Sequence, residues 1–77
     1  MKTIQILGTG CPKCKLLFAN TEAAVQAAGL AAKIEKVEKI TDILKFGVMS
    51  THALVVDGAV KSVGKVLNPD EIRKHLE

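Results

Sequence analysis

Apolar and polar residues alternate at the start of the chain, and the spacing then changes to that of a helix. The alternation over residues 3–7 predicts a strand that is buried on at least one face. Over residues 12–28, apolar and small residues recur at intervals of three and four, as on one face of a helix, and Gly29 is typical of the position after a last turn. Residues 31–37 predict a second strand. A strand-helix-strand unit of this length places its two strands parallel in one sheet.

A short second helix is predicted over residues 41–46. Thr41 is of a residue type that caps helices, and Gly47 is placed to end this one. Ile43 and Leu44 are expected to point inward. The segment after this helix then serves as a loop to the next strand.

The clearest turn signal in the sequence is Asp57-Gly58. This dipeptide favours the tight turn of a two-residue β-hairpin, because both positions can adopt positive φ angles. It joins residues 53–56 to residues 59–63 as antiparallel neighbours. Since the first two strands are expected to be parallel, the sheet is predicted to be mixed.

The last helix is marked by several start signals. Asn68 can cap it, Pro69 suits the first helical position, and Glu71 can reach back to the cap. Leu67 and Ile72 have the spacing of a hydrophobic staple across the cap. The chain is therefore predicted to be one α/β domain, residues 1–77, with the order β-α-β-α-β-β-α.

Composition argues against several classes of function. The 77 residues include 11 basic and 8 acidic ones, a net charge of +3, with no long run of like charges. Arg73 is the only arginine, and Phe18 and Phe46 are the only aromatic residues, so platforms for base stacking are scarce and we expect no nucleic-acid binding. The first apolar run is too short for a signal peptide, and no stretch approaches membrane-spanning length. We therefore expect a cytoplasmic protein without a membrane partner.

Cys11 and Cys14 are the only cysteines, and they lie at the predicted start of the first helix. A thiol pair in the cytoplasm is mostly reduced, which favours catalysis or metal binding over a structural disulfide. At the helix boundary, unpaired N–H groups, the helix dipole, Lys13 and Lys15 would stabilise a Cys11 thiolate. Cys14 falls on the apolar face one turn later and should be less exposed and less easily ionised. The pair is typical of a dithiol in which Cys11 attacks a disulfide and Cys14 resolves the mixed disulfide.

Two other interpretations of the cysteine pair remain open. Cys11 and Cys14 could bind a soft metal such as Cu(I) or Zn(II), with His52 as a possible third ligand. Small metal chaperones also carry paired cysteines after a first strand, but their domains end in a strand, whereas this chain is predicted to end in a helix. Alternatively, both cysteines are buried apolar residues without a chemical role. The redox interpretation is preferred, and it requires no resident metal and no organic cofactor.

Three segments together resemble a known family. They are GTGCPKC after the first strand, GVMSTHALVVDG around the hairpin, and KSVGKVLNPDEI at the last helix. They are similar to the small redox-active disulfide proteins of the thioredoxin and glutaredoxin superfamily, and the resemblance covers nearly the whole chain. It implies a four-stranded sheet with the first strand central and helices on both faces. It also implies thiol-disulfide exchange by Cys11 and Cys14, in a monomer that acts on protein disulfides and is reduced by an upstream disulfide reductase.

The resemblance implies a substrate groove around the thiols, and one of its positions departs from the family pattern. The groove would be formed by Gly10, Pro12, Lys13, Thr51 and His52. Similar proteins carry a cis-proline where this chain has His52, and a cis bond before a non-proline residue costs about 3 kcal/mol. The imidazole could be a surface side chain without a role, an imidazolium that stabilises the Cys11 thiolate, or a metal ligand.

Overall fold

The secondary structure follows the predicted order of elements. The computed structural model describes residues 2–8, 12–48 and 52–76. Within them the elements are β1 (Lys2–Leu7), α1 (Pro12–Ala28), β2 (Ala32–Val37), α2 (Ile40–Lys45), β3 (Ala53–Val56), β4 (Ala59–Val63) and α3 (Pro69–Leu76). The predicted order β-α-β-α-β-β-α is therefore confirmed.

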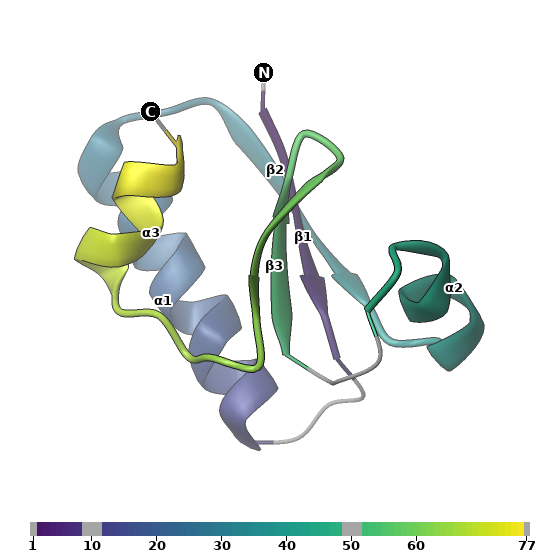
Figure 1. Cartoon of the computed structure of the whole chain (residues 1–77). Helices are drawn as coiled ribbons and strands as arrows, with labels where there is room; N and C mark the ends of the chain where they lie inside the picture. Colours follow the sequence, from purple (N-terminus) through teal and green to yellow (C-terminus); the bar gives the residue numbers. More distant parts are fainter. Residues whose placement is uncertain (1, 9–11, 49–51, 77) are drawn as a thin grey trace.

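The strands form a four-stranded mixed sheet in the order β2-β1-β3-β4 within the described residues. β1 pairs parallel with β2 and antiparallel with β3, and β3 pairs antiparallel with β4. In Figure 1, α1 and α3 lie on one side of the sheet and α2 lies on the other. The central position of the first strand and the helices on both faces agree with the expectation. Because β1 pairs with a strand on each side, the position of its C-terminal end is fixed.

The larger core lies between the sheet and the helices α1 and α3. Successive side chains of a strand point to opposite faces, so Ile4 and Ile6 of β1 face these helices together. The core also contains Leu17, Ala24, Leu54, Val56, Leu67, Ile72 and Leu76. Thr21 is fully buried among them and satisfies its hydroxyl by donating to the Leu17 carbonyl at 2.8 Å. This packing fixes α1, and with it the first turn of that helix, against the sheet.

The smaller core lies on the opposite face, under α2. It consists of Leu7, Ile43, Val48, Ala53 and Val55. Leu7 joins this core because it is one residue out of phase with the isoleucines that face α1. The second face of the sheet therefore rests on fewer large side chains than the first.

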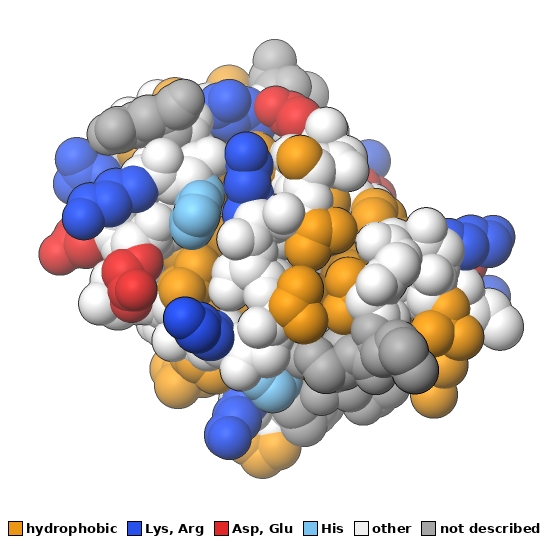
Figure 2. Space-filling model, in the orientation of Figure 1, with side chains coloured by type: hydrophobic (Ala, Val, Ile, Leu, Met, Phe, Trp, Pro, Cys, Tyr) orange, Lys and Arg blue, Asp and Glu red, His pale blue; other side chains and the backbone are white. Residues whose placement is uncertain are grey.

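Two predictions about α2 were wrong. Thr41 does not cap the helix, because the helix begins at Ile40 and Lys39 occupies the capping position without a side-chain hydrogen bond. Ile43 is buried as expected, but Leu44 is 52% exposed. Only a narrow face of this six-residue helix packs against the sheet, and Ile43 is its buried residue. Figure 2 shows hydrophobic side chains at the surface in the region of α2. Gly47 does end the helix, with a φ of 77° and its N–H donated to the Leu44 carbonyl.

The start of α3 has the predicted capping box. The Glu71 N–H donates to Asn68 Oδ1 at 2.8 Å, and the Asn68 N–H donates to Glu71 Oε1 at 3.2 Å. Leu67 and Ile72, the two residues of the predicted staple, are both buried in the larger core. Asn20 of α1 donates to the Leu67 carbonyl at 2.9 Å, which ties α1 to the segment that leads into α3.

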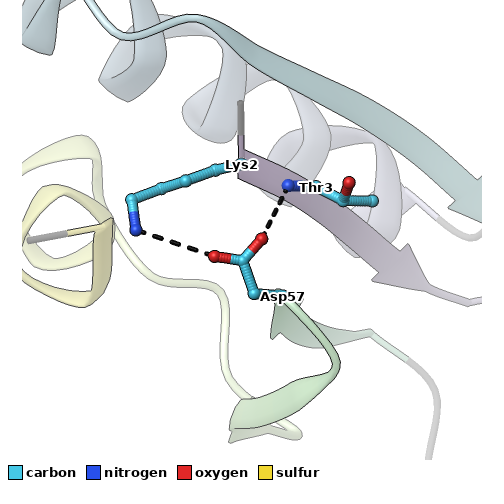
Figure 3. Close-up of polar contacts among 3 residues, drawn as sticks. All are labelled: Lys2, Thr3 and Asp57. Carbon is cyan, nitrogen blue, oxygen red and sulfur yellow. Dashed lines mark hydrogen bonds and ion pairs between the residues drawn. The ribbon is translucent and has the colours of Figure 1, made fainter.

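The hairpin turn also holds the beginning of β1. Asp57 and Gly58 have φ angles of 50° and 83°, as the predicted turn requires. Asp57 accepts a hydrogen bond from the Thr3 N–H at 2.9 Å through its side chain, and its own N–H donates to the Thr3 carbonyl at 2.8 Å. Lys2 Nζ lies 3.7 Å from the same carboxylate (Figure 3). Asp57 is therefore more than a turn residue, because it fastens the hairpin to the central strand.

None of the helices in the described residues combines the length and the apolar composition that spanning a lipid bilayer requires.

Candidate redox site

The candidate site lies where β1 ends and α1 begins. Pro12 and Lys13 are exposed at the start of the helix, and Cys14 follows in the same turn with only 6% of its surface exposed. The predicted burial of Cys14 is thus confirmed, and it results from the helical spacing that places Cys14, Leu17 and Thr21 on the covered face. Cys11 lies outside the described residues, as do Gly10 and Thr51 of the predicted groove.

The Cys14 side chain packs against Gly8, the residue after β1. A Cβ atom placed on Gly8 would overlap the Cys14 sulfur and would lie 3.1 Å from the Cys14 Cβ. Gly8 is buried, and its N–H donates to the Val37 carbonyl at 3.0 Å. The sulfur therefore occupies the volume that any other residue at position 8 would fill with its side chain.

His52 reaches the same place from the other half of the chain. Its backbone nitrogen would lie 3.3 Å from a Cβ on Gly8, so His52 and Cys14 both border this glycine. His52 is half-buried and has a φ of 49°, an uncommon value for a residue with a side chain. Its carbonyl accepts a hydrogen bond from the Gly64 N–H at 3.2 Å, next to the β3–β4 pairing. The structure thus brings together two of the predicted site residues, Cys14 and His52.

A small pocket opens beside Cys14 at the edge between α1 and β2. Its walls are formed by Ile6, Gly8, Cys14, Lys15, Lys36 and Glu38. Lys36 is placed there by the parallel pairing that sets it opposite Ile6, and its ammonium group also lies 4.7 Å from the centre of the Phe18 ring. Sequence reasoning missed Gly8, Lys36 and Glu38 as neighbours of Cys14. Only the register of β1 and β2 would have indicated the last two.

The charges around the first turn of α1 are predominantly positive. The turn contains no acidic residue, and both Lys13 and Lys15 are exposed on it. Lysines at this end oppose the usual preference of the helix dipole for negative charge, at a cost of some tenths of a kcal/mol each. The same arrangement favours a thiolate, because the amide groups, the dipole and the ammonium groups all attract it.

Among residues 2–8, 12–48 and 52–76, no three His, Cys, Asp or Glu side chains lie close enough together to hold a metal ion. A ligand set of Cys11, Cys14 and His52 includes a residue outside this range, so it stays an untested prediction. His75 is half-buried in α3.

The fold and the site define a class of protein. A mixed sheet with its first strand in the interior, helices on both faces, and a cysteine in the first turn of the helix after that strand are features of thioredoxin-like α/β proteins.

Comparison with known proteins agrees with this class. Residues 2–77 match the thioredoxin domain family. The chain is 41% identical over 76 residues to a thioredoxin of Methanothermobacter thermautotrophicus, with 99% of both chains covered. It is 35% identical over 77 residues to a thioredoxin of Methanocaldococcus jannaschii. This match covers all of the present chain and 88% of the relative. The chain therefore belongs to the thioredoxin family, and this membership supports a thioredoxin-like oxidoreductase function.

Proposed function

We propose that this protein is a thiol-disulfide oxidoreductase that cycles between a Cys11/Cys14 dithiol and a disulfide. The observation that carries the proposal is the placement of Cys14, which is buried in the first turn of α1 against the end of the central strand of a thioredoxin fold. A buried second thiol is protected from competing reactions, and Cys11, three positions earlier, is the proposed attacking thiol. Lys13 and Lys15 support the ionisation of the attacking thiol.

The reaction consists of two exchanges at sulfur. The Cys11 thiolate attacks a substrate disulfide, so a mixed disulfide forms and one substrate sulfur leaves as a thiolate that takes up a proton. Cys14 then loses its proton and attacks Cys11 Sγ, which forms the intramolecular disulfide and releases the second substrate sulfur as a thiol. Two electrons and two protons pass to the substrate. An external dithiol reductant returns them to the Cys11/Cys14 pair.

The partners proposed for this cycle are proteins. The substrates are protein disulfides, and an upstream disulfide reductase supplies the electrons, without an organic cofactor bound to this chain. Exposed apolar residues such as Leu16 on α1 and Val63 on β4 offer surface for such contacts. We place the cycle in the cytoplasm, where a reduced dithiol is maintained, and propose that the protein acts as a monomer.

The experiment that tests this proposal is reduction of insulin disulfides by dithiothreitol, with and without the protein. The wild type should accelerate the reaction, and Cys11→Ser should abolish the acceleration. Cys14→Ser should give one attack and then accumulate a mixed disulfide through Cys11, which mass spectrometry detects. Turnover retained by Cys11→Ser would contradict the assigned roles.

Two measurements on the purified protein separate redox chemistry from metal binding. A thiol count before and after mild oxidation should show two thiols lost together, and metal analysis should find no stoichiometric Cu or Zn. Bound metal that is lost in His52→Ala would instead support ligation by Cys11, Cys14 and His52, and would contradict the redox proposal.

A further inference from the structure

We propose that Gly8 is a positioning residue for thiol-disulfide exchange: by lacking a side chain, it admits the Cys14 sulfur against the end of β1 and keeps that sulfur buried. The proposal rests on the redox function above and deepens it. Gly8 lies outside the Cys11–Cys14 motif, and we assign to it the positioning of the second thiol before that thiol attacks.

The reason for glycine at position 8 is space rather than backbone conformation. Gly29, Gly47 and Gly58 all have positive φ angles, and a Cβ on any of them would meet no atom within 4 Å. Gly8 is not among the glycines with positive φ, so its φ angle does not require glycine. A Cβ there would overlap the Cys14 sulfur and press on the His52 backbone. The glycine is therefore explained by its contact with these two residues.

The backbone at Gly8 cannot move away from this contact at low cost. Leu7, immediately before it, is fully buried and is paired with Val37 of β2 on one side and Ala53 of β3 on the other. Gly8 itself continues the β2 pairing through its hydrogen bond to the Val37 carbonyl. A side chain added at position 8 would therefore displace its neighbours rather than the strand.

Among the described residues, a pocket offers the displaced sulfur an open direction. The pocket beside Cys14, with Lys15, Lys36 and Glu38 in its wall, lies next to both Gly8 and Cys14. A Cβ at position 8 would turn the Cys14 side chain toward this pocket and toward water. Cys14 would then lose its protection, and its sulfur would leave the position from which it attacks the mixed disulfide.

The direct test is the alkylation rate of Cys14 by iodoacetamide in a Cys11→Ser background, where it is the only thiol. Adding Gly8→Ala should raise this rate by about tenfold or more, because a buried thiol becomes accessible. Gly29→Ala in the same background is the matched control, since it adds a methyl group at a strained φ but meets no atom near Cys14. Equal rates for Gly8→Ala and the control would overturn the proposal.

A second measurement covers the case in which Gly8→Ala folds poorly. Urea unfolding of Gly8→Ala is compared in the wild-type and Cys14→Ala backgrounds. Gly8→Ala should raise the unfolding equilibrium constant about tenfold with Cys14 present, as overpacking does, and clearly less when the sulfur is gone. The same factor in both backgrounds would show that the sulfur is not what Gly8 accommodates.

These two tests do not depend on disulfide reduction by the protein. Gly8→Ala could leave the alkylation rate of Cys14 unchanged and have the same effect on unfolding with and without Cys14. If the wild type still reduces insulin, only the proposed role of Gly8 is then contradicted. If wild type does not reduce insulin but both tests give the expected results, the redox proposal fails and the packing of Cys14 on Gly8 stands.

Discussion

Two residues with left-handed backbone conformations bracket β3, and they differ in what surrounds them. His52 precedes the strand with a φ of 49°, and Asp57 follows it with a φ of 50°. Asp57 lies beside the beginning of β1, where its side chain and backbone both bond to Thr3. His52 lies beside the end of β1, next to Gly8 and Cys14.

The same backbone conformation belongs to the hairpin turn at one end of β1 and lies beside the candidate redox site at the other. At Asp57 the conformation follows from a two-residue turn with Gly58, and aspartate tolerates it because its short side chain bonds locally. At His52 the left-handed conformation costs a residue with a side chain about 1–2 kcal/mol. Strained residues of this kind cluster at functional sites.

The largest stability effect is expected at the Asp57 end. Asp57→Ala removes the acceptor for the Thr3 N–H and leaves alanine in a left-handed conformation, so the free energy of unfolding should fall by about 2 kcal/mol. Asp57→Asn keeps an acceptor oxygen and should lose far less. Urea unfolding measures both, and insulin reduction should stay at the wild-type rate. A slowed reaction would mean that the two ends of β1 are not independent.

A smaller stability effect, combined with a loss of activity, is expected at the His52 end. His52→Val places a β-branched side chain at a positive φ, which should lower the free energy of unfolding by about 1 kcal/mol. Because the His52 backbone borders Gly8 and Cys14, insulin reduction should also slow by several fold at a temperature where the protein is folded. His52→Asn tolerates the conformation and is the control for stability. Full activity in His52→Val would remove the functional distinction between His52 and Asp57.

The charges at the two ends provide a third contrast. Lys2 lies beside a carboxylate, whereas the first turn of α1 carries Lys13 and Lys15 without an acidic residue. Lys15→Gln should slow alkylation of Cys11 at neutral pH by about two- to fivefold, measured in a Cys14→Ser background, because less positive charge leaves less thiolate. Added salt should shrink the difference. Lys61→Gln on β4 is the control, and an equal effect there would contradict a local role.

The smallest effect is expected from the ion pair at the Asp57 end. Lys2→Gln removes a partner 3.7 Å from the Asp57 carboxylate, but both side chains are partly exposed. Exposed pairs contribute little, so the free energy of unfolding should change by roughly 0.5 kcal/mol or less. Thermal unfolding at low and high salt checks this. A loss of stability as large as that of Asp57→Ala would show that the ion pair with Lys2, rather than the hydrogen bond from Thr3, accounts for the contribution of Asp57.

The parts of the fold that were predicted correctly depend on residues close together in sequence. The cap of α3 is contained in Asn68, Pro69 and Glu71, and the hairpin turn in Asp57-Gly58. Each of these segments makes its diagnostic hydrogen bonds or dihedral angles within four residues, so composition and spacing suffice. The burial of Cys14 belongs to the same group, because helical spacing alone places it with Leu17.

The parts that could not be predicted depend on what another element contributes. Leu44 has the right spacing to be buried, but its exposure is decided by how little of α2 meets the sheet. Lys36 and Glu38 reach the pocket beside Cys14 only through the register of β2 on β1. The crowding at Gly8 likewise requires α1 and His52 to approach the same atom from different halves of the chain.

The position of β1 between β2 and β3 has a consequence for the order of folding. The β1-α1-β2 unit needs only contacts of modest sequence separation, whereas the pairing of β1 with β3 closes a loop of about two thirds of the chain and forms more slowly. During synthesis Cys14 is therefore present on a nascent chain before His52 and β3, which complete its surroundings, have been made. An oxidant could therefore react with Cys14 at this stage, whereas in the folded protein Cys14 is buried beside the backbone of His52.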